Sequence, residues 1–247
     1  MEGKSAIIIP ARYGSSRLEG KPLLEVLGKP VIQWVYEKAK QSKLADIIIV
    51  ATDDQRIYDC VKSFGGEVEM TSTEHKSGSD RIMEVVSRHP EIAYICNLQG
   101  DEPLIKPESI DEVIKNVKDD ESADISTLIR EISTQEAQNP NLVKCVKDIN
   151  SFALYFSRSQ IPYERNTGIA KFYGHLGIYG YKRQALETMT KLNQTMLEKT
   201  ESLEQLRALE NGMKIKTTVV DFVPVGIDTK EDLEKFRKIV EEKLVTK

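Results

Sequence analysis

Short apolar runs alternate with helical hydrophobic patterns along the first half of the chain. The apolar runs predict buried strands over residues 5–10, 46–52, 67–71 and 92–98. The patterns between them predict helices near 30–42, 54–64, 78–89 and 107–118. Strands that alternate with helices are typical of βαβ units, and continuous runs such as DIIIVAT suit parallel strands that are covered on both faces. We therefore expect an α/β fold with a mainly parallel sheet.

After about residue 122 the pattern changes, because the predicted strands follow one another closely. The strand-like stretches are ADISTLIREI, LVKCVKD, FALYFSR, FYGHLGIYGY and, later, KIKTTVVDF. A helix fits ESLEQLRALENG, with Gly212 as its C-terminal stop. An amphipathic helix fits DTKEDLEKFRKIVEEKL, with Asp228 or Thr229 as its N-cap. We interpret residues 1–247 as a single domain with a mixed sheet and an inserted subdomain at about 152–200.

Charge and cysteine content narrow the classes of protein. Lys and Arg number 35 and Asp and Glu 39, which gives a formal net charge of −4. A general nucleic-acid or anionic-membrane binder is usually basic, so we expect neither partner, and any anion binding must be local. No apolar stretch approaches the ~20 residues that span a bilayer, and the first residues lack the pattern of a signal peptide. Cys60, Cys96 and Cys145 are far apart and fit no metal or disulfide framework, which favours a cytoplasmic location.

The loop that follows the first strand, within AIIIPARYGSSRLEGKP, is rich in groups that bind anions. It carries three cations and two serines, which are Arg12, Arg17, Lys21, Ser15 and Ser16. Ligands of open α/β sheets bind beyond the carboxyl ends of strands, and glycines let backbone N–H groups approach an anion. The loop fits either an anion site or an ordinary solvated surface. It contains neither GxGxxG nor GxxxxGK[ST], so a phosphate site here is of another kind and a dehydrogenase is not indicated.

Seven motifs in order carry a resemblance to a known family. The loop PARYGSSRLEGKPL is similar to the signature loop of sugar-activating nucleotidyltransferases. The remaining motifs resemble the 3-deoxy-manno-octulosonate (Kdo) cytidylyltransferase family, the CMP-Kdo synthetases, from about residue 5 to 240: TSTEHKSGSDRIMEVV, CNLQGDEPLI, ALYFSRSQIPYER, YGHLGIYGY, ESLEQLRALENG and VGIDTKEDLEK. The resemblance implies a Rossmann-like nucleotidyltransferase sheet with an inserted dimerisation subdomain, and a homodimer. It implies the reaction of CTP with Kdo to CMP-Kdo and pyrophosphate, for lipopolysaccharide biosynthesis, with Mg²⁺ as cofactor.

The same resemblance assigns a nucleotide site. The positions that match CTP-binding residues are Arg12, Ser15, Lys21, Gly78, Ser79, Arg81 and Gln99. Arg12, Lys21 and Asp101 are the expected catalytic residues. In-line attack on the α-phosphorus needs positioning and charge stabilisation, and Arg12 and Lys21 would offset charge that grows on the departing pyrophosphate. Arg17 lies in the same loop. Ser79, together with Asp80, also fits a plain role in helix capping.

Two carboxylates match the family's metal ligands. Asp101 follows the fourth strand in NLQGDEP, and Asp228 precedes the last helix. Mg²⁺ usually takes one or two carboxylates together with phosphate oxygens. Each residue has a competing structural role, because Asp101 could cap a turn before Pro103 and Asp228 could cap the last helix. The sequence does not show that the two side chains approach each other.

The acceptor pocket is also implied by the resemblance. The matching residues are Arg158, His175, Tyr179, Glu204 and Gln205. Arg158 would hold the sugar carboxylate, because a planar guanidinium suits it and stays charged. The other side chains would bind the hydroxyls.

Position 19 departs from the family, which usually reads RLPGKP where this chain has Glu19. A carboxylate near the triphosphate would weaken CTP binding unless it points outward or pairs with Lys21. Three alternatives to the Kdo reaction stay open: an 8-amino-Kdo cytidylyltransferase, an acylneuraminate cytidylyltransferase, and a nucleotide-sugar-binding protein without turnover. Because binding alone does not require Lys21, Asp101 and Asp228 together, their presence favours an enzyme.

Overall fold

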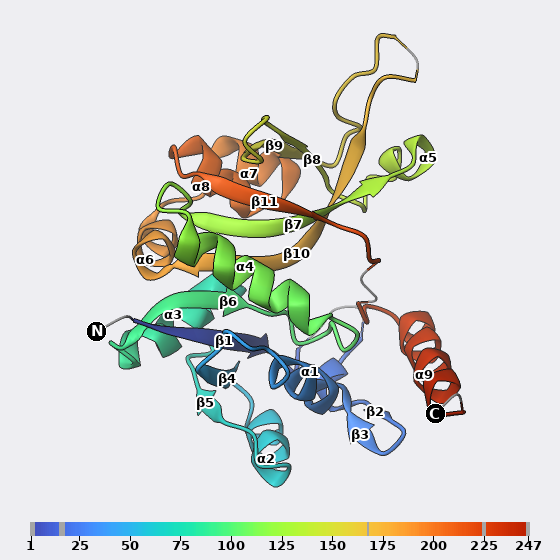
Figure 1. The fold of residues 1–247 in the computed structure, drawn as a ribbon. Helices are drawn as coiled ribbons and strands as arrows, with labels where there is room; N and C mark the ends of the chain where they lie inside the picture. Colours follow the sequence, from blue (N-terminus) through green and yellow to red (C-terminus); the bar gives the residue numbers. More distant parts are fainter. Residues whose placement is uncertain (1–2, 15–17, 167, 224–225, 246–247) are drawn as a thin grey trace. The chain divides into compact units, whose positions relative to one another are not determined.

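The computed structural model describes residues 3–14, 18–166, 168–223 and 226–245. The chain forms two compact units (Figure 1). Unit 1 contains Met1–Asp111 and Pro224–Lys247, and unit 2 contains Glu112–Val223. The helix α4 (Pro107–Asp119) includes the boundary between them. Among the described residues, no helix combines the length and the apolar character that crossing a bilayer requires.

Unit 1 is built on parallel strands in the order β6-β1-β4-β5. The strands are β1 (Lys4–Ala11), β4 (Ile47–Thr52), β5 (Val68–Met70) and β6 (Ile92–Asn97). The connecting helices are α1 (Val31–Ala39), α2 (Gln55–Ser63) and α3 (Gly78–Arg88). Residues 6–9 of β1 have no exposed surface, as expected of a strand that is covered on both faces. The predicted α/β fold with a mainly parallel sheet is confirmed, and element ends differ from the predictions by a few residues.

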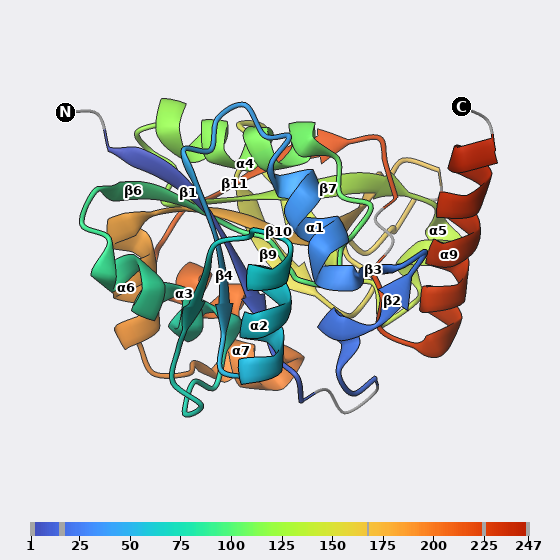
Figure 2. The same ribbon diagram turned by 90° about the horizontal axis from the view of Figure 1, so that it is seen from below.

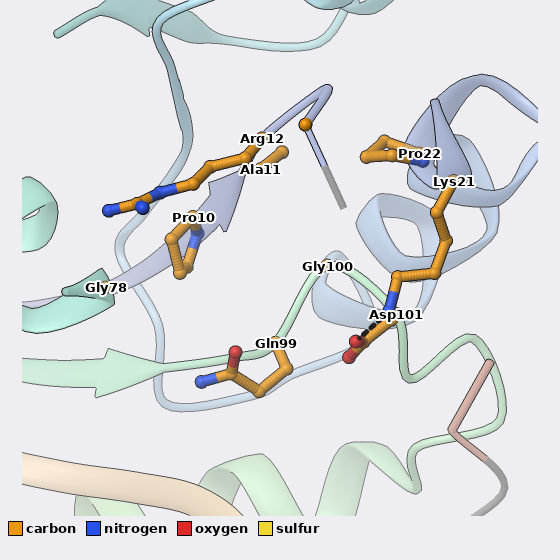
Figure 3. A pocket seen from close by; sticks show the side chains of 10 residues that line it. Pro10, Ala11, Arg12, Lys21, Pro22, Gly78, Gln99, Gly100 and Asp101 are labelled. Atoms are coloured by element: carbon orange, nitrogen blue, oxygen red, sulfur yellow. Dashed lines mark hydrogen bonds and ion pairs between the residues drawn. The ribbon is translucent and has the colours of Figure 1, made fainter. Parts of the chain in front are cut away.

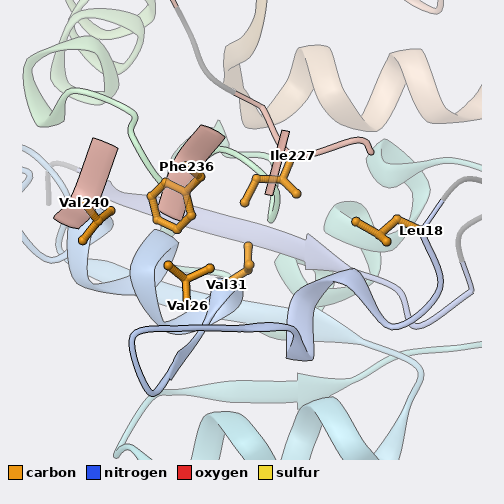
Figure 4. Close-up of a cluster of buried hydrophobic side chains, with 6 residues drawn as sticks. All are labelled: Leu18, Val26, Val31, Ile227, Phe236 and Val240. Atoms are coloured by element: carbon orange, nitrogen blue, oxygen red, sulfur yellow. The ribbon is translucent and has the colours of Figure 1, made fainter. Parts of the chain in front are cut away.

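A second hydrophobic core of unit 1 lies between the segment that follows β1 and the last helix of the chain. The loop after β1 enters the short helix η1 (Lys21–Leu23) and the hairpin of β2 (Glu25–Val26) and β3 (Lys29–Pro30). The last helix, α9 (Lys230–Val245), lies beside this hairpin in both views (Figures 1 and 2). The buried side chains that pack there are Leu18, Val26, Val31, Ile227, Phe236 and Val240 (Figure 4). This packing fixes the segment before α9, which carries Asp228, to unit 1.

Unit 2 has a mixed sheet, as predicted. Its central order is β11-β7-β10, in which β11 (Ile215–Val220) is parallel to β7 (Ile125–Ile132) and β10 (Phe172–Lys182) is antiparallel to it. The hairpin of β8 (Lys144–Lys147) and β9 (Ala153–Ser157) joins through β8 to β10. The helices are α5 (Thr134–Ala137), α6 (Arg183–Lys191), α7 (Met196–Glu201) and α8 (Gln205–Glu210). The whole range 152–200 lies in unit 2, and its separate identity as a dimerisation subdomain stays a prediction.

The prediction of one helix over 201–212 is wrong. Helix α7 ends at Glu201, because Ser202 takes a left-handed conformation with φ 53°, and α8 begins at Gln205. The buried ion pair between Glu198 and Arg207, 2.5 Å from Oε1 to Nη2, joins the two helices. In one continuous helix, residues nine apart lie on opposite faces, so the break is what allows this pair to form. Gly212, with φ 79°, follows α8 as the predicted stop.

Candidate functional site

The carboxyl ends of β1 and β6 border a cavity of about 380 Å³ in unit 1 (Figure 3). Neighbouring parallel strands end at the same edge of a sheet, which is the usual place for a ligand. The lining consists of Pro10, Ala11, Arg12, Gly14, Lys21, Pro22, Gly78, Gln99, Gly100 and Asp101. Five of these are predicted site residues: Arg12, Lys21, Gly78 and Gln99 for binding CTP, and Asp101 as a catalytic residue and metal ligand. Ser15 and Arg17 lie outside the described residues.

Lys21 joins the two predicted metal ligands. Its Nζ lies 2.5 Å from Asp101 Oδ2 and 3.1 Å from Asp228 Oδ1. The Lys21 side chain is only 13% exposed, which strengthens its pairing with both carboxylates. The backbone N–H of Ile227 donates to Asp101 O at 2.9 Å and thereby brings the neighbouring Asp228 to this point. The structure therefore shows the approach of Asp101 and Asp228 that the sequence left open.

Thr229, the neighbour of Asp228, has the capping role at α9 that the sequence also allowed for Asp228. The Thr229 Oγ1 atom accepts a hydrogen bond from the Asp232 N–H at 3.2 Å, and Asp232 Oδ2 accepts one from the Thr229 N–H at 3.1 Å. This reciprocal pair is a capping box at the start of α9. Asp228 is thus not the N-cap. Asp101 directs its carboxylate to Lys21, which also argues against the turn-capping role.

Arg12 extends away from Lys21 and Asp101 (Figure 3). Its Nη2 donates to the carbonyls of His75 at 2.7 Å and Ser77 at 3.2 Å. Ser77 is the N-cap of α3 and forms a capping box with Asp80. Asp80 therefore has the predicted capping role, and Arg12 fixes the turn that presents Gly78 and the first N–H groups of α3 at the cavity.

Two predicted nucleotide residues are placed beneath the surface. Ser79 is 1% exposed and Arg81 is fully buried, and neither is among the described residues that line the cavity. Arg81 Nη2 forms an ion pair of 2.6 Å with Asp53 Oδ2, and Nη1 donates to Thr71 Oγ1. Sequence reasoning missed Asp53. The available signal was an acidic residue directly after β4, at the edge of the sheet where ligands bind.

Gln99 lies at the cavity, and its Nε2 donates to Asn97 Oδ1 at 3.1 Å. This bond orients the amide oxygen of Gln99 as an acceptor. Glu19 is exposed and is not among the lining residues, so in this structure the departure from the family's proline points outward.

Unit 2 brings several of the predicted acceptor residues together on β10. The rings of His175 and Tyr179 lie 5.3 Å apart between centroids, and His175 packs edge-on against Phe156. The His175 Nε2 atom is 3.0 Å from Thr127 Oγ1. Burial lowers the pKa of His175 to about 3, so its imidazole is neutral at physiological pH. Burial, followed by the charges of Tyr181, Glu204 and Cys145, raises the pKa of Tyr179.

The start of α8 holds the next two predicted acceptor residues. Gln205 is 6% exposed, and its Nε2 has no hydrogen-bond partner among the described residues. Glu204 precedes it and lies 3.7 Å from Arg207. A buried amide with an unused donor is costly unless a ligand satisfies it, so Gln205 has the character of a binding residue.

Arg158 has a different setting from the one predicted. Its Nε donates to Glu201 O at 2.8 Å and its Nη1 to Pro140 O at 3.3 Å. Its backbone N–H donates to Glu201 Oε2 at 2.9 Å. In this structure much of the guanidinium therefore serves backbone carbonyls, and the role as carboxylate binder stays a prediction. Among the described residues, no group of three or more His, Cys, Asp or Glu side chains is arranged to hold a metal.

Comparisons with known proteins identify the family. The family model described as Cytidylyltransferase matches residues 6–215. The chain is 49% identical over 236 residues to the 3-deoxy-manno-octulosonate cytidylyltransferase of Fusobacterium nucleatum, with 95% of this chain and 96% of the relative covered. It is 50% identical over 245 residues to that of Thermodesulfovibrio yellowstonii, covering 94% and 96%. The chain belongs to the 3-deoxy-manno-octulosonate cytidylyltransferase family.

A solved structure described as CMP:2-keto-3-deoxy-manno-octonic acid synthetase complexed with CTP agrees with this membership. It matches with a TM-score of 0.94 and 45% identity, covering 97% of this chain and 99% of that chain. As a member of the 3-deoxy-manno-octulosonate cytidylyltransferase family, the protein is a nucleotidyltransferase. The resemblance inferred from the seven motifs is confirmed.

Proposed function

We propose that the protein transfers CMP from CTP to the anomeric hydroxyl of Kdo, releasing pyrophosphate and supplying CMP-Kdo for lipopolysaccharide biosynthesis. Family membership and the CTP named in the matched structure support the nucleotide. The observation that carries the proposal is the convergence of Asp101 and Asp228 on the Lys21 ammonium at the edge of the cavity. Binding a nucleotide does not by itself require two acids and a lysine at one point, whereas transfer of a charged group benefits from all three.

On the nucleotide side, we assign the charge-bearing roles to unit 1. Lys21 would neutralise oxygens of the departing pyrophosphate, and Arg12 would hold the turn before α3, whose Gly78 lines the cavity. The Gln99 amide would contact the nucleotide. Ser79 and Arg81 are assigned to shaping this turn from beneath, since both are buried. Ser15 remains a proposed phosphate donor.

We propose Mg²⁺ as the cofactor, with Asp101 and Asp228 as its protein ligands. The two carboxylates already accommodate one cation, because oxygens of both lie within 3.1 Å of the same Lys21 nitrogen. Both donors are hard carboxylate oxygens, the ligand type that Mg²⁺ prefers. When bound, the ion would neutralise phosphate charge and lower the energy of a developing negative charge.

On the acceptor side, we assign recognition of the sugar acid to unit 2. His175 is neutral and Gln205 keeps an unused donor, so both suit hydroxyl groups better than a carboxylate. Tyr179 and Glu204 complete this polar set. Arg158 is proposed to hold the carboxylate with the part of its guanidinium that does not serve Glu201 O and Pro140 O.

Kdo is the proposed acceptor in preference to its 8-amino analogue or N-acetylneuraminate. The experiment is pyrophosphate release with CTP and Mg²⁺, measured with each of the three acids. Preference for Kdo over the nine-carbon acid supports the proposal. Preference for N-acetylneuraminate contradicts it, preference for 8-amino-Kdo moves it to that acceptor, and binding of CTP without pyrophosphate release with any acid indicates a non-catalytic protein.

A homodimer formed through unit 2 is also proposed. Four large apolar side chains within 152–200 are strongly exposed, namely Leu154 (62%), Tyr163 (89%), Ile169 (74%) and Met196 (71%). We propose that these side chains contribute to one apolar patch, because a contiguous exposed apolar patch is typical of an interface. Light scattering that gives a monomer at micromolar concentration would contradict the dimer. The cytoplasm stays the proposed compartment, on the cysteine pattern.

A further inference from the structure

The first turn of α2 carries a guanidinium whose plane is fixed by a neighbour. Asp54, the N-cap of α2, accepts from Arg56 Nε at 2.9 Å and from Arg56 Nη2 at 2.7 Å. The Arg56 backbone N–H also donates to Asp54 Oδ1 at 2.9 Å. A bidentate pair of this kind sets the orientation of the guanidinium as well as its position. The arginine is 57% exposed, so it contributes little to the core of unit 1.

This guanidinium lies on the ring of Tyr13. The Arg56 Cζ atom is 3.3 Å from the ring centroid, within the range of a cation–π contact. Tyr13 belongs to the loop after β1, one residue from Arg12. The contact therefore ties the loop after β1 to α2, which packs against β4 and β5.

Tyr13 in turn fixes the residue before Lys21. The Gly20 N–H donates to Tyr13 O at 2.9 Å. A Cβ added at Gly20 would lie 3.0–3.2 Å from two ring carbons and the hydroxyl oxygen of Tyr13, so the phenol packs directly on the Gly20 backbone. Gly20 has φ 66°, a conformation that glycine adopts freely. Asp54 thus contacts Arg56, Arg56 contacts Tyr13, and Tyr13 contacts Gly20. Gly20 is bonded directly to Lys21.

We propose that Arg56 is a positioning residue for Lys21, acting by holding Tyr13 and Gly20 so that the Lys21 ammonium meets the triphosphate in one orientation. The inference rests on the proposed function. Arg56 is not among the described residues that line the cavity, so it acts through the loop rather than on the nucleotide.

The test compares Arg56→Ala and Arg56→Lys with the wild type. We expect Arg56→Ala to lower kcat/KM for CTP by about fivefold, the size of an exposed cation–π contact, while KM for the sugar acid and Tm stay unchanged. Arg56→Lys keeps the charge but loses the planar stack and the bidentate pair. Its kcat/KM for CTP should therefore lie between those of Arg56→Ala and the wild type. Lys62→Ala is the matched control, because Lys62 lies on the same helix 5.9 Å from the ring of Tyr58, outside the loop. It should leave kcat/KM for CTP unchanged.

Coupling provides the second measurement. Tyr13→Leu removes the ring. The double variant Tyr13→Leu with Arg56→Ala should have the same kcat/KM for CTP as the less active of the two single variants. Additive losses, or Arg56→Ala with the wild-type kcat/KM for CTP, overturn the inference. Equal losses with CTP and sugar acid together with a lowered Tm also overturn it, because they indicate a merely structural residue.

Failure of the proposed function gives a different result. If the wild type releases no pyrophosphate with any sugar acid, the reaction is wrong, and the Arg56 inference is then decided by CTP binding in titration calorimetry. A Kd for CTP about fivefold weaker in Arg56→Ala, with Lys62→Ala unchanged, still supports the positioning role. Equal Kd values in the wild type and Arg56→Ala contradict it.

Discussion

The cavity of unit 1 and the polar cluster of unit 2 use opposite electrostatics. At the cavity, full charges are paired with one another, as in Lys21 with Asp101 and Asp228. In the polar cluster of unit 2, His175 is kept neutral, and Gln205 Nε2 has no hydrogen-bond partner among the described residues. Paired charges suit a ligand with several negative charges, since the partners can be exchanged for phosphate and metal. Neutral buried groups suit a ligand with many hydroxyls, since each unused hydrogen bond penalises the wrong shape.

The largest effect is expected from Lys21→Ala, which removes the cation from the charged region. Activity should fall by about 10²–10³-fold, the usual cost of losing one group that stabilises developing charge. Stability should fall much less than activity, because the Asp101 and Asp228 side chains are 29% and 49% exposed and stay partly solvated when the ammonium is removed. The measurement is pyrophosphate release at saturating CTP, with Lys29→Ala as the control, a half-exposed lysine paired with Glu37. A wild-type rate in Lys21→Ala would contradict the triphosphate role.

The neutral state of His175 in unit 2 should make the free energy of unfolding depend on pH. The pKa of His175 is lowered to about 3 in the folded state, below the ordinary value near 6.5, so protons bind preferentially to the unfolded chain. The contribution of His175 to stability is therefore complete above pH 6.5 and is lost as the pH falls toward 3, by at most about 1.4 kcal/mol per pH unit.

Chemical denaturation of the wild type and His175→Gln at pH 7.5, 6 and 5 isolates this contribution from that of the carboxylates. We expect the difference in the free energy of unfolding between the two proteins to shrink by up to about 2 kcal/mol between pH 7.5 and 5. A difference that is independent of pH would show that His175 titrates normally and is not kept neutral.

Gln205→Met tests whether the unused donor is reserved for the sugar. The Gln205 amide is buried, and its Nε2 has no partner among the described residues, so an apolar side chain of similar shape should raise the free energy of unfolding by about 1 kcal/mol. The same change should raise KM for the sugar acid about tenfold, at unchanged KM for CTP. Gln184→Met, at an exposed position on α6, should change neither quantity. If stability falls and KM for the sugar is unchanged, Gln205 is a structural residue.

The smallest effect is expected from Glu19→Pro, which concerns the edge of the charged region. Proline would stabilise the protein by about 0.4–1 kcal/mol, because it restricts the unfolded chain. Since Glu19 is exposed, KM for CTP should stay within about twofold of the wild-type value. A larger change in KM would mean that the carboxylate acts directly on the nucleotide.

Many of the elements and site residues could be predicted from the sequence, because local pattern and motif were sufficient for them. The strands of unit 1, the cavity-lining Lys21, Gly78, Gln99 and Asp101, and the cap at Asp80 follow from hydrophobic period, strand order and motif. The approach of Asp101 and Asp228 could not be predicted, because it depends on a backbone hydrogen bond between segments far apart in the chain.

Other details depend on competition between similar groups. Asp228 and Thr229 both fit the N-cap of the last helix, and only the geometry assigns the cap to Thr229. The break at Ser202, which allows the Glu198–Arg207 pair to form, is not revealed by local helical propensity. The directions of Arg12 and Arg158 are set by backbone carbonyls, which carry no sequence signal.

The most direct measurement is the Mg²⁺ dependence of pyrophosphate release in Asp101→Asn and Asp228→Asn. Both changes keep the side-chain shape and remove a charge from the group that surrounds Lys21. We predict a loss of about 10²-fold in each and a shift of half-maximal activity to higher Mg²⁺. Asp111→Asn, which alters an acid of unit 1 that binds Ser42, should keep the wild-type Mg²⁺ curve. A wild-type Mg²⁺ curve in both Asp101→Asn and Asp228→Asn would contradict the central claim that these two carboxylates form the cation site of the reaction.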